Sequence, residues 1–168
     1  CGEVGDGRIL EPDQLVSALF DVPQHWSGQR LLITAGPTFE DIDPVRFIGN
    51  RSSGKMGFAV AAAAAQQGAD VILVAGPVSL PTPPGVSRID VRSAAQMLDA
   101  VMSNLKGADA FIGAAAVADY RVKQFSNRKI KKTESDPQLD LERTIDILAT
   151  VSNHPERPRF VLGFAAET

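Results

Sequence analysis

The chain has 168 residues, 44% of them hydrophobic and 22% charged, which is enough apolar material for one globular domain with a packed core. The net charge of −3 excludes a general attraction to nucleic acid or to anionic membranes, so an anionic ligand needs a local basic cluster. No apolar run is long enough to span a membrane. Cys1 is the only cysteine, which excludes an intrachain disulfide, and we expect a soluble cytoplasmic protein.

The first 27 residues differ in composition from the rest of the chain. A glycine-rich, turn-like opening precedes a short amphipathic pattern at residues 12–20, and a polar stretch with a proline follows it. We expect residues 1–27 to be a linker or the tail of an upstream domain. Residues 28–168 then form the folded domain.

Buried strands alternate with helices from residue 30 onward. Continuous apolar runs predict strands buried on both faces at 30–36, 69–77, 108–116 and 159–168, with a shorter strand candidate at 86–91. Helical patterns lie between them at 55–69, 93–107 and 144–154. The alternation predicts an α/β fold, a three-layer, Rossmann-like, doubly wound and mainly parallel sheet. No helix follows the last strand, so we expect the domain to continue past Thr168, with its C-terminal part missing here.

Small residues mark the carboxyl ends of the predicted strands, where ligands of doubly wound sheets bind. Glycine and alanine there let the backbone approach a ligand closely. Asp119 follows one of these ends, so it is a candidate for holding a metal ion or a ribose hydroxyl. The structural alternative for Asp119 is an N-cap or a surface turn.

A long polar loop, residues 36–54, joins the first predicted strand to its helix, and loops of this length are usually functional. Its polar side chains include Glu40, Asp41, Asp43, Arg46 and the run from Asn50 to Ser53. The unpaired N–H groups at the start of the following helix favour a phosphate or a carboxylate. The alternative is that Ser52 or Ser53 only caps the helix.

Two nucleotide-binding motifs are disfavoured by the same region. Residues 49–55 match the spacing of a P-loop up to its lysine, but Met56 stands where that motif needs a hydroxyl for magnesium. The GxGxxG fingerprint of nicotinamide-binding proteins is absent after the first strand, and no acidic residue ends the second strand. A nicotinamide oxidoreductase is therefore a less favoured alternative.

Residues 120–140 interrupt the alternation of strands and helices and carry a basic cluster of Arg128, Lys129, Lys131 and Lys132. The segment lacks helical or strand periodicity, so we expect a flap. A flap lysine is a good candidate for stabilising a polyphosphate leaving group during a reaction. The alternative is a solvated run of charge.

Six motifs, in order along the chain, closely resemble the phosphopantothenoylcysteine synthetase domain of bacterial bifunctional coenzyme A biosynthesis proteins. They are ITAGPT (33–38), DPVRFIGNRSSGKMG (43–57), VAGPVSLP (74–81), AAAVADYR (114–121), KIKK (129–132) and GFAAET (163–168). The opening CGEVGDGR is similar to the last motif of the fused decarboxylase, with Cys1 as the remnant of its catalytic cysteine. FMN belongs only to that decarboxylase half, which is absent here.

The resemblance implies a ligase of coenzyme A biosynthesis. CTP and Mg²⁺ activate 4′-phosphopantothenate as an acyl-cytidylate, and cysteine then displaces CMP. It implies a homodimer, with residues 43–55 near the partner, fused to a decarboxylase domain in the parent protein. We expect weak or absent turnover from the chain as it stands, because the family continues past GFAAET into a lysine-bearing segment. The alternative from another class is a nonenzymatic nucleotide-binding or assembly domain.

The resemblance also assigns site residues. The implied catalytic residues are Asn50, tied to the intermediate, and Lys129, on the flap. The implied nucleotide contacts are Gly113, Ala114, Ala115, Asp119, Lys129, Arg143, Thr144, Ile145 and Phe164, with Asp119 also a metal candidate. The implied substrate contacts are Arg46, Asn50, Ser52, Ser53, Gly54 and Lys55. One departure affects this set, since Thr144, Ile145 and Asp146 stand where the family commonly has Asn-Pro-Asp.

Overall fold

The computed structural model describes residues 25–131 and 138–164. Residues 1–24 of the expected upstream tail, which include Cys1 and the short amphipathic segment, lie outside these residues, as does Lys132. Within the described ranges, no helix combines the length and apolar character needed to cross a membrane.

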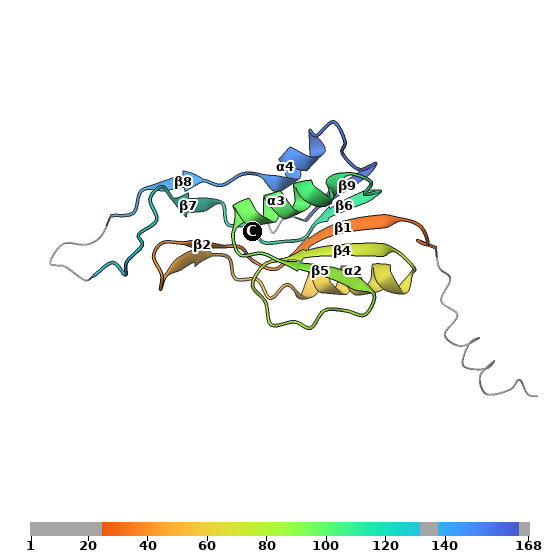
Figure 1. Ribbon diagram of the computed structural model, residues 1–168, viewed down its shortest axis with the longest axis horizontal. Coiled ribbons are helices and arrows are strands. Elements are labelled where there is room, and N and C mark those ends of the chain that lie inside the picture. Colours follow the sequence, from red (N-terminus) through yellow and green to blue (C-terminus); the bar gives the residue numbers. More distant parts are fainter. Residues whose placement is uncertain (1–24, 132–137, 165–168) are drawn as a thin grey trace, which may run out of the picture.

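A parallel sheet forms the centre of the described structure (Figure 1). Its strands, in spatial order, are β5 (Val86–Asp90), β4 (Asp70–Ala75), β1 (Arg30–Ala35), β6 (Ala110–Gly113) and β9 (Phe160–Gly163). Strand β1 is in the middle of the sheet, β4 and β5 follow on one side of it, and the chain then crosses to the other side to form β6 and β9. The strand order therefore reverses between β1 and β6, as in doubly wound folds, and the predicted α/β architecture is confirmed.

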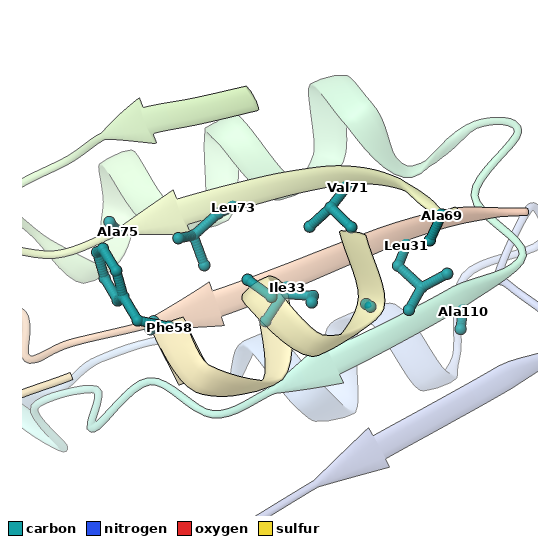
Figure 2. Packing of buried hydrophobic residues seen from close by; sticks show 11 residues of the cluster. Leu31, Ile33, Phe58, Ala69, Val71, Leu73, Ala75 and Ala110 are labelled. Carbon is teal, nitrogen blue, oxygen red and sulfur yellow. The ribbon is translucent and has the colours of Figure 1, made fainter. Parts of the chain in front are cut away.

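Helices cover both faces of the sheet. Figure 2 shows the face under α2 (Lys55–Gln66), where Phe58 packs with Ile33, Leu73 and other apolar residues of β1 and β4. On the opposite face, α3 (Ala94–Leu105) and α4 (Ile147–Ser152) contribute to a second cluster with Leu32 and Phe111. Neighbouring residues of β1 serve opposite clusters because side chains alternate along a strand.

Local sequence explains where the helices begin. The hydroxyl of Ser93 accepts from Gln96 N–H at 3.2 Å while the Gln96 side chain accepts from Ser93 N–H, which is a capping box at the start of α3. Helix α2 instead begins after Gly54, which has a left-handed φ of 74° and no side-chain cap. Neither serine is the N-cap of α2, although Ser52 Oγ accepts from the N–H of Gly54 at 3.3 Å.

Two short antiparallel hairpins extend from the sheet. One pairs β2 (Phe39–Asp41) with β3 (Phe47–Gly49) inside the predicted 36–54 loop, and the other pairs β7 (Tyr120–Val122) with β8 (Leu141–Arg143). Strands β2 and β7 are in contact, and both hairpins lie toward one end of the molecule (Figure 1). The sequence analysis gave no strand at 120–122, because three residues are too few to display a period of two.

Two expectations about the C-terminal third are wrong. Strand β9 is not buried on both faces, because it is the edge strand and exposes Phe160 (61%) and Leu162 (52%). Helix α4 begins at Ile147 rather than at Thr144. The Asp146 side chain caps α4 by accepting from Ala149 N–H at 2.8 Å, so the preceding residues belong to the connection from β8.

Candidate functional site

A cavity of about 670 Å³ lies beyond the carboxyl ends of β1, β6 and β9, on the face of the sheet that carries α4. It adjoins the point where the strand order reverses, which is where doubly wound sheets bind ligands. The buried Phe111 and Ile147 give it an apolar floor, and the exposed Asp119 and Arg143 give it a polar rim. Its volume is within the range of small-molecule sites.

Seven of the nine residues implied to contact a nucleotide line this cavity. They are Gly113, Ala115, Asp119, Arg143, Thr144, Ile145 and Phe164. They come from four separate parts of the chain, so the fold brings together residues that are up to about fifty positions apart in the sequence. Ala114 and Lys129 are not among the lining residues.

Backbone hydrogen bonds fix the small residues at the cavity. Beyond the ends of the strands, Ala114 N–H donates to the Thr34 carbonyl at 3.1 Å, and Phe164 N–H donates to the Gly113 carbonyl at 3.1 Å. The Thr34 hydroxyl accepts from Ala115 N–H at 3.3 Å. These bonds extend the sheet past its strands, so the main chain at the cavity is held by hydrogen bonds within the chain.

Eight lining residues were missed by the sequence analysis. They are Thr34, Phe111, Val117, Tyr120, Asp146, Ile147, Leu148 and Gly163. Thr34 and Gly163 stand at strand ends, a signal that could have included them. Phe111 and Ile147 have the pattern of ordinary core residues, and nothing local distinguishes them.

Asp119 stands at the cavity rim and is exposed. Its carbonyl accepts from Thr144 N–H at 2.9 Å, and the Thr144 hydroxyl donates to the Ala118 carbonyl at 2.5 Å, which joins the 118–119 turn to the residues after β8. Among the described residues, no group of three or more acidic, histidine or cysteine side chains could hold a metal ion. Two carboxylates line the cavity, that of Asp119 and that of Asp146, which caps α4.

Asn50 lies next to the cavity without lining it. Its side-chain amide donates to the Val117 carbonyl at 2.9 Å, and Val117 is a lining residue. This bond ties the loop after β3 to the segment after β6. The other implied substrate contacts lie farther along the loop, where Ser52 Oγ accepts from Gly54 N–H at 3.3 Å, and Ser53 and Lys55 are exposed.

The three acidic residues of the loop hold the β2–β3 hairpin in place. The buried carboxylate of Glu40 accepts from Ala94 N–H at 2.7 Å, at the start of α3. Asp41 forms a bidentate pair with Arg92 at 2.6 and 3.0 Å. The hydrogen bonds from Arg92, helped by its charge, lower the pKa of the Asp41 carboxyl in spite of partial burial.

Asp43 connects the same loop to the basic segment. Its carboxylate accepts from Ile130 N–H at 3.1 Å and pairs with Arg46, whose guanidinium also donates to the Ile130 carbonyl at 2.7 Å. Arg46 and the exposed Lys129 are thereby held in one unit, although they are 83 positions apart in the sequence. This unit lies on the hairpin side of the molecule, and Lys129 does not line the cavity.

The strand order, the helices on both faces and a cavity at the switch point define a Rossmann-like α/β domain. The chain belongs to the family described as the DNA/pantothenate metabolism flavoprotein C-terminal domain, whose sequence model matches residues 26–168.

Similar proteins agree with this assignment. Coenzyme A biosynthesis bifunctional protein CoaBC of Vibrio cholerae is 54% identical over 172 aligned residues, and that of Escherichia coli is 49% identical over 174. Each alignment covers 100% of this chain and 43% of the relative, so the chain spans less than half the length of these proteins. The crystal structure of the C-terminal domain of CoaBC matches with a TM-score of 0.74 and 48% identity, over 85% of this chain and 67% of that one.

Proposed function

We propose that this chain carries the ligase activity of coenzyme A biosynthesis, joining 4′-phosphopantothenate to cysteine at the expense of CTP. The products are phosphopantothenoylcysteine, CMP and pyrophosphate, formed through an acyl-cytidylate. The observation that carries the proposal is the cavity at the switch point of a chain of this family, lined by seven of the residues implied to bind the nucleotide.

The chemistry of the cavity suits a nucleotide. Glycine and alanine at the strand ends let the main chain approach a base closely, and backbone carbonyl groups can accept from the amino group of cytosine. The apolar floor suits a planar base, while the Arg143 guanidinium at the rim suits phosphate. These features favour a nucleoside triphosphate without selecting CTP over ATP.

Asp119 is the residue we assign to Mg²⁺. Magnesium is commonly held by one or two carboxylates together with substrate phosphates, so the exposed carboxylate of Asp119 fits it. The ion neutralises phosphate charge when bound. The contribution of the chain is to hold Asp119 in the turn fixed by Thr144.

The two steps of the reaction divide between two residues. In the first, a carboxylate oxygen of 4′-phosphopantothenate attacks the α-phosphorus of CTP and pyrophosphate leaves, with Lys129 stabilising its charge. In the second, the amine of cysteine attacks the acyl carbon, CMP leaves, and the amide forms. Asn50 hydrogen-bonds the acyl group in this step, and its bond to Val117 holds its amide beside the cavity.

The dimer is part of the proposal, and exposed apolar side chains of the hairpins and the adjoining segments support it. Val45 is 59% exposed, and Phe47, Phe125 and Leu141 each expose 45% or more. Apolar side chains gathered at one end of a molecule mark an interaction surface. Lys129 and Arg46, which lie on that side and outside the cavity lining, then serve a site that two copies complete.

We further propose a cytoplasmic protein in which residues 1–27 are the end of an upstream FMN-dependent decarboxylase and residues 28–168 belong to the ligase domain.

One experiment separates this function from its alternatives. The full-length protein is incubated with 4′-phosphopantothenate and labelled CTP, and acyl-cytidylate, CMP and pyrophosphate are measured with and without cysteine. Lys129→Gln should prevent formation of the intermediate, whereas Asn50→Asp should let it accumulate. Lys131→Gln is the matched control for Lys129, since it removes an exposed cation of the same segment. Binding of CTP without any acyl-cytidylate favours a nonenzymatic domain, and binding of NAD(P) favours an oxidoreductase.

A further inference from the structure

We propose that Asp43 is a positioning residue for the first half-reaction, because its buried carboxylate fixes the backbone at Ile130 and thereby holds Lys129. The inference rests on the proposed function, in which Lys129 stabilises the leaving pyrophosphate. No role was assigned to Asp43 beyond its place in the polar loop.

The two oxygens of Asp43 have different tasks. Oδ1 accepts from Val45 N–H at 2.8 Å and from Arg46 N–H at 2.9 Å, which closes the local turn after residue 43. Oδ2 accepts from the Arg46 guanidinium at 2.5 Å and from Ile130 N–H at 3.1 Å, which reaches a segment 87 positions away. The Arg46 guanidinium completes the connection by donating to the Ile130 carbonyl at 2.7 Å.

A second tie lies on the other side of Lys129. Ser126 N–H donates to the Ile42 carbonyl at 3.1 Å, and the Ser126 hydroxyl donates to the Arg128 carbonyl at 2.7 Å. The stretch from Ser126 to Ile130 is therefore attached to residues 42–46 at both of its ends. Lys129 itself is exposed, so the contacts that restrict it act through its backbone.

The Asp43 side chain is fully buried, with 0% of its surface exposed, whereas that of Arg46 is 44% exposed. Burial raises the pKa of Asp43, but the hydrogen bonds from Ile130, Val45 and Arg46 outweigh it and lower the pKa to about 2. The carboxylate is thus charged at neutral pH. A buried charge with this many donors keeps its partners in one arrangement, since releasing any of them leaves it under-paired.

Asp43→Asn is the variant that separates the two tasks. The amide oxygen can replace Oδ1 and keep the local turn, but the amide NH₂ then faces two donors, Ile130 N–H and the Arg46 guanidinium. The bond to the basic segment is lost while the turn remains. Asp41→Asn is the matched control, because it makes the same change two residues earlier and breaks only the pair with Arg92.

The first readout is independent of activity. A nitroxide spin label is placed at position 129 through Lys129→Cys in a Cys1→Ser background, and its mobility is measured by electron paramagnetic resonance. Asp43→Asn should increase the mobility of the label, and Asp41→Asn should leave it unchanged. Equal spectra with and without Asp43→Asn overturn the proposal, whether or not the protein is a ligase.

The second readout is catalytic and uses the unlabelled full-length protein. Asp43→Asn should lower the rate of acyl-cytidylate formation by roughly tenfold to a hundredfold, as expected of a misplaced charge, with the Kd for CTP changed less than about twofold. Any residual rate that Lys129→Gln leaves should fall little further when Asp43→Asn is added, since the lysine it positions is gone. An unchanged rate with a mobile label, or fully additive losses, overturns the proposal.

Ile130→Pro provides a second route if Asp43→Asn fails to fold. It deletes the N–H that Asp43 accepts and leaves the turn at residues 43–46 intact. It should reproduce the increased mobility of the label and the slower first half-reaction, and failure to do either counts against the proposal. Absence of acyl-cytidylate in the wild-type protein refutes the proposed function instead, and leaves the mobility result standing.

Discussion

Replacing Gly57 by alanine tests whether α2 rests directly on β1. A Cβ atom at position 57 would lie 2.5 Å from the Ala35 Cβ and 3.2 Å from the Thr34 carbonyl oxygen. Carbon atoms in contact prefer about 3.5–4.0 Å. One of the obstacles is backbone and the other is a methyl group without rotamers, so neither can turn aside. The helix must therefore move away from the strand.

Two effects of opposite sign set the change in unfolding free energy that Gly57→Ala causes. Alanine is favoured over glycine in a helix interior by about 1 kcal/mol. Overpacking a close-packed site costs typically about 1–3 kcal/mol, and a contact this short belongs at the upper end. The net loss of unfolding free energy is then about 2 kcal/mol, which corresponds to a fall in Tm of roughly 4–8 °C for a chain of this size.

Urea unfolding followed by circular dichroism measures this loss. Ala59→Gly, at an exposed position of the same helix, is the control for helix propensity and should cost about 1 kcal/mol with no packing change. Gly57→Ala combined with Ala35→Gly should recover part of the loss, because the second change removes the Cβ in the way. A Gly57→Ala protein as stable as the wild type refutes the close approach of α2 to β1.

Three further outcomes follow from individual contacts. Because the pKa of Asp43 falls from 3.8 to about 2 on folding, its stabilisation is complete above about pH 4 and is lost as the pH falls toward 2 and below. Thermal melts should show the Tm difference between the wild type and Asp43→Asn becoming smaller as the pH falls through that range. A Tm difference that does not change with pH contradicts the prediction. Gly163→Ala should push the Leu148 side chain, which the new methyl would overlap, into the cavity. The Kd for CTP should then rise on the order of tenfold in calorimetry, with little change in Tm. Ser93→Ala removes the side-chain cap of α3 and should cost about 1 kcal/mol in urea unfolding, whereas Ser87→Ala, in β5, should cost less.

Local patterns were sufficient for the main elements of the fold. The apolar runs at 30–36 and 69–77 became β1 and β4, and Ser93 with Gln96 marked the start of α3. The small residues at the strand ends indicated the edge of the sheet where the cavity lies, because parallel strands joined by helices must all point the same way. Each of these signals is contained in a few neighbouring residues.

Other features depend on contacts that no local window contains. Strand β9 has the apolar composition of a buried strand, and only its position at the edge of the sheet exposes Phe160 and Leu162. The strands of the two hairpins are three residues each, so they are defined by their partners rather than by periodicity. In the sequence, nothing distinguishes Asp43 from Glu40 and Asp41, the other acidic residues of the loop. Its burial and its bond to Ile130 became visible only when the two segments met.

The sequence by itself determined the order of the central strands and the helices, the edge of the sheet where the cavity lies and, through its motifs, which small residues are candidates for the cavity. These depend on periodicity, capping and composition, which are short-range properties of the chain. Only the tertiary structure decided that Gly113, Asp119, Arg143 and Phe164 share one cavity, and that Asp43 holds the segment of Lys129. Burial and hydrogen-bond partners are set by residues distant in sequence, so they exist only once the chain has folded.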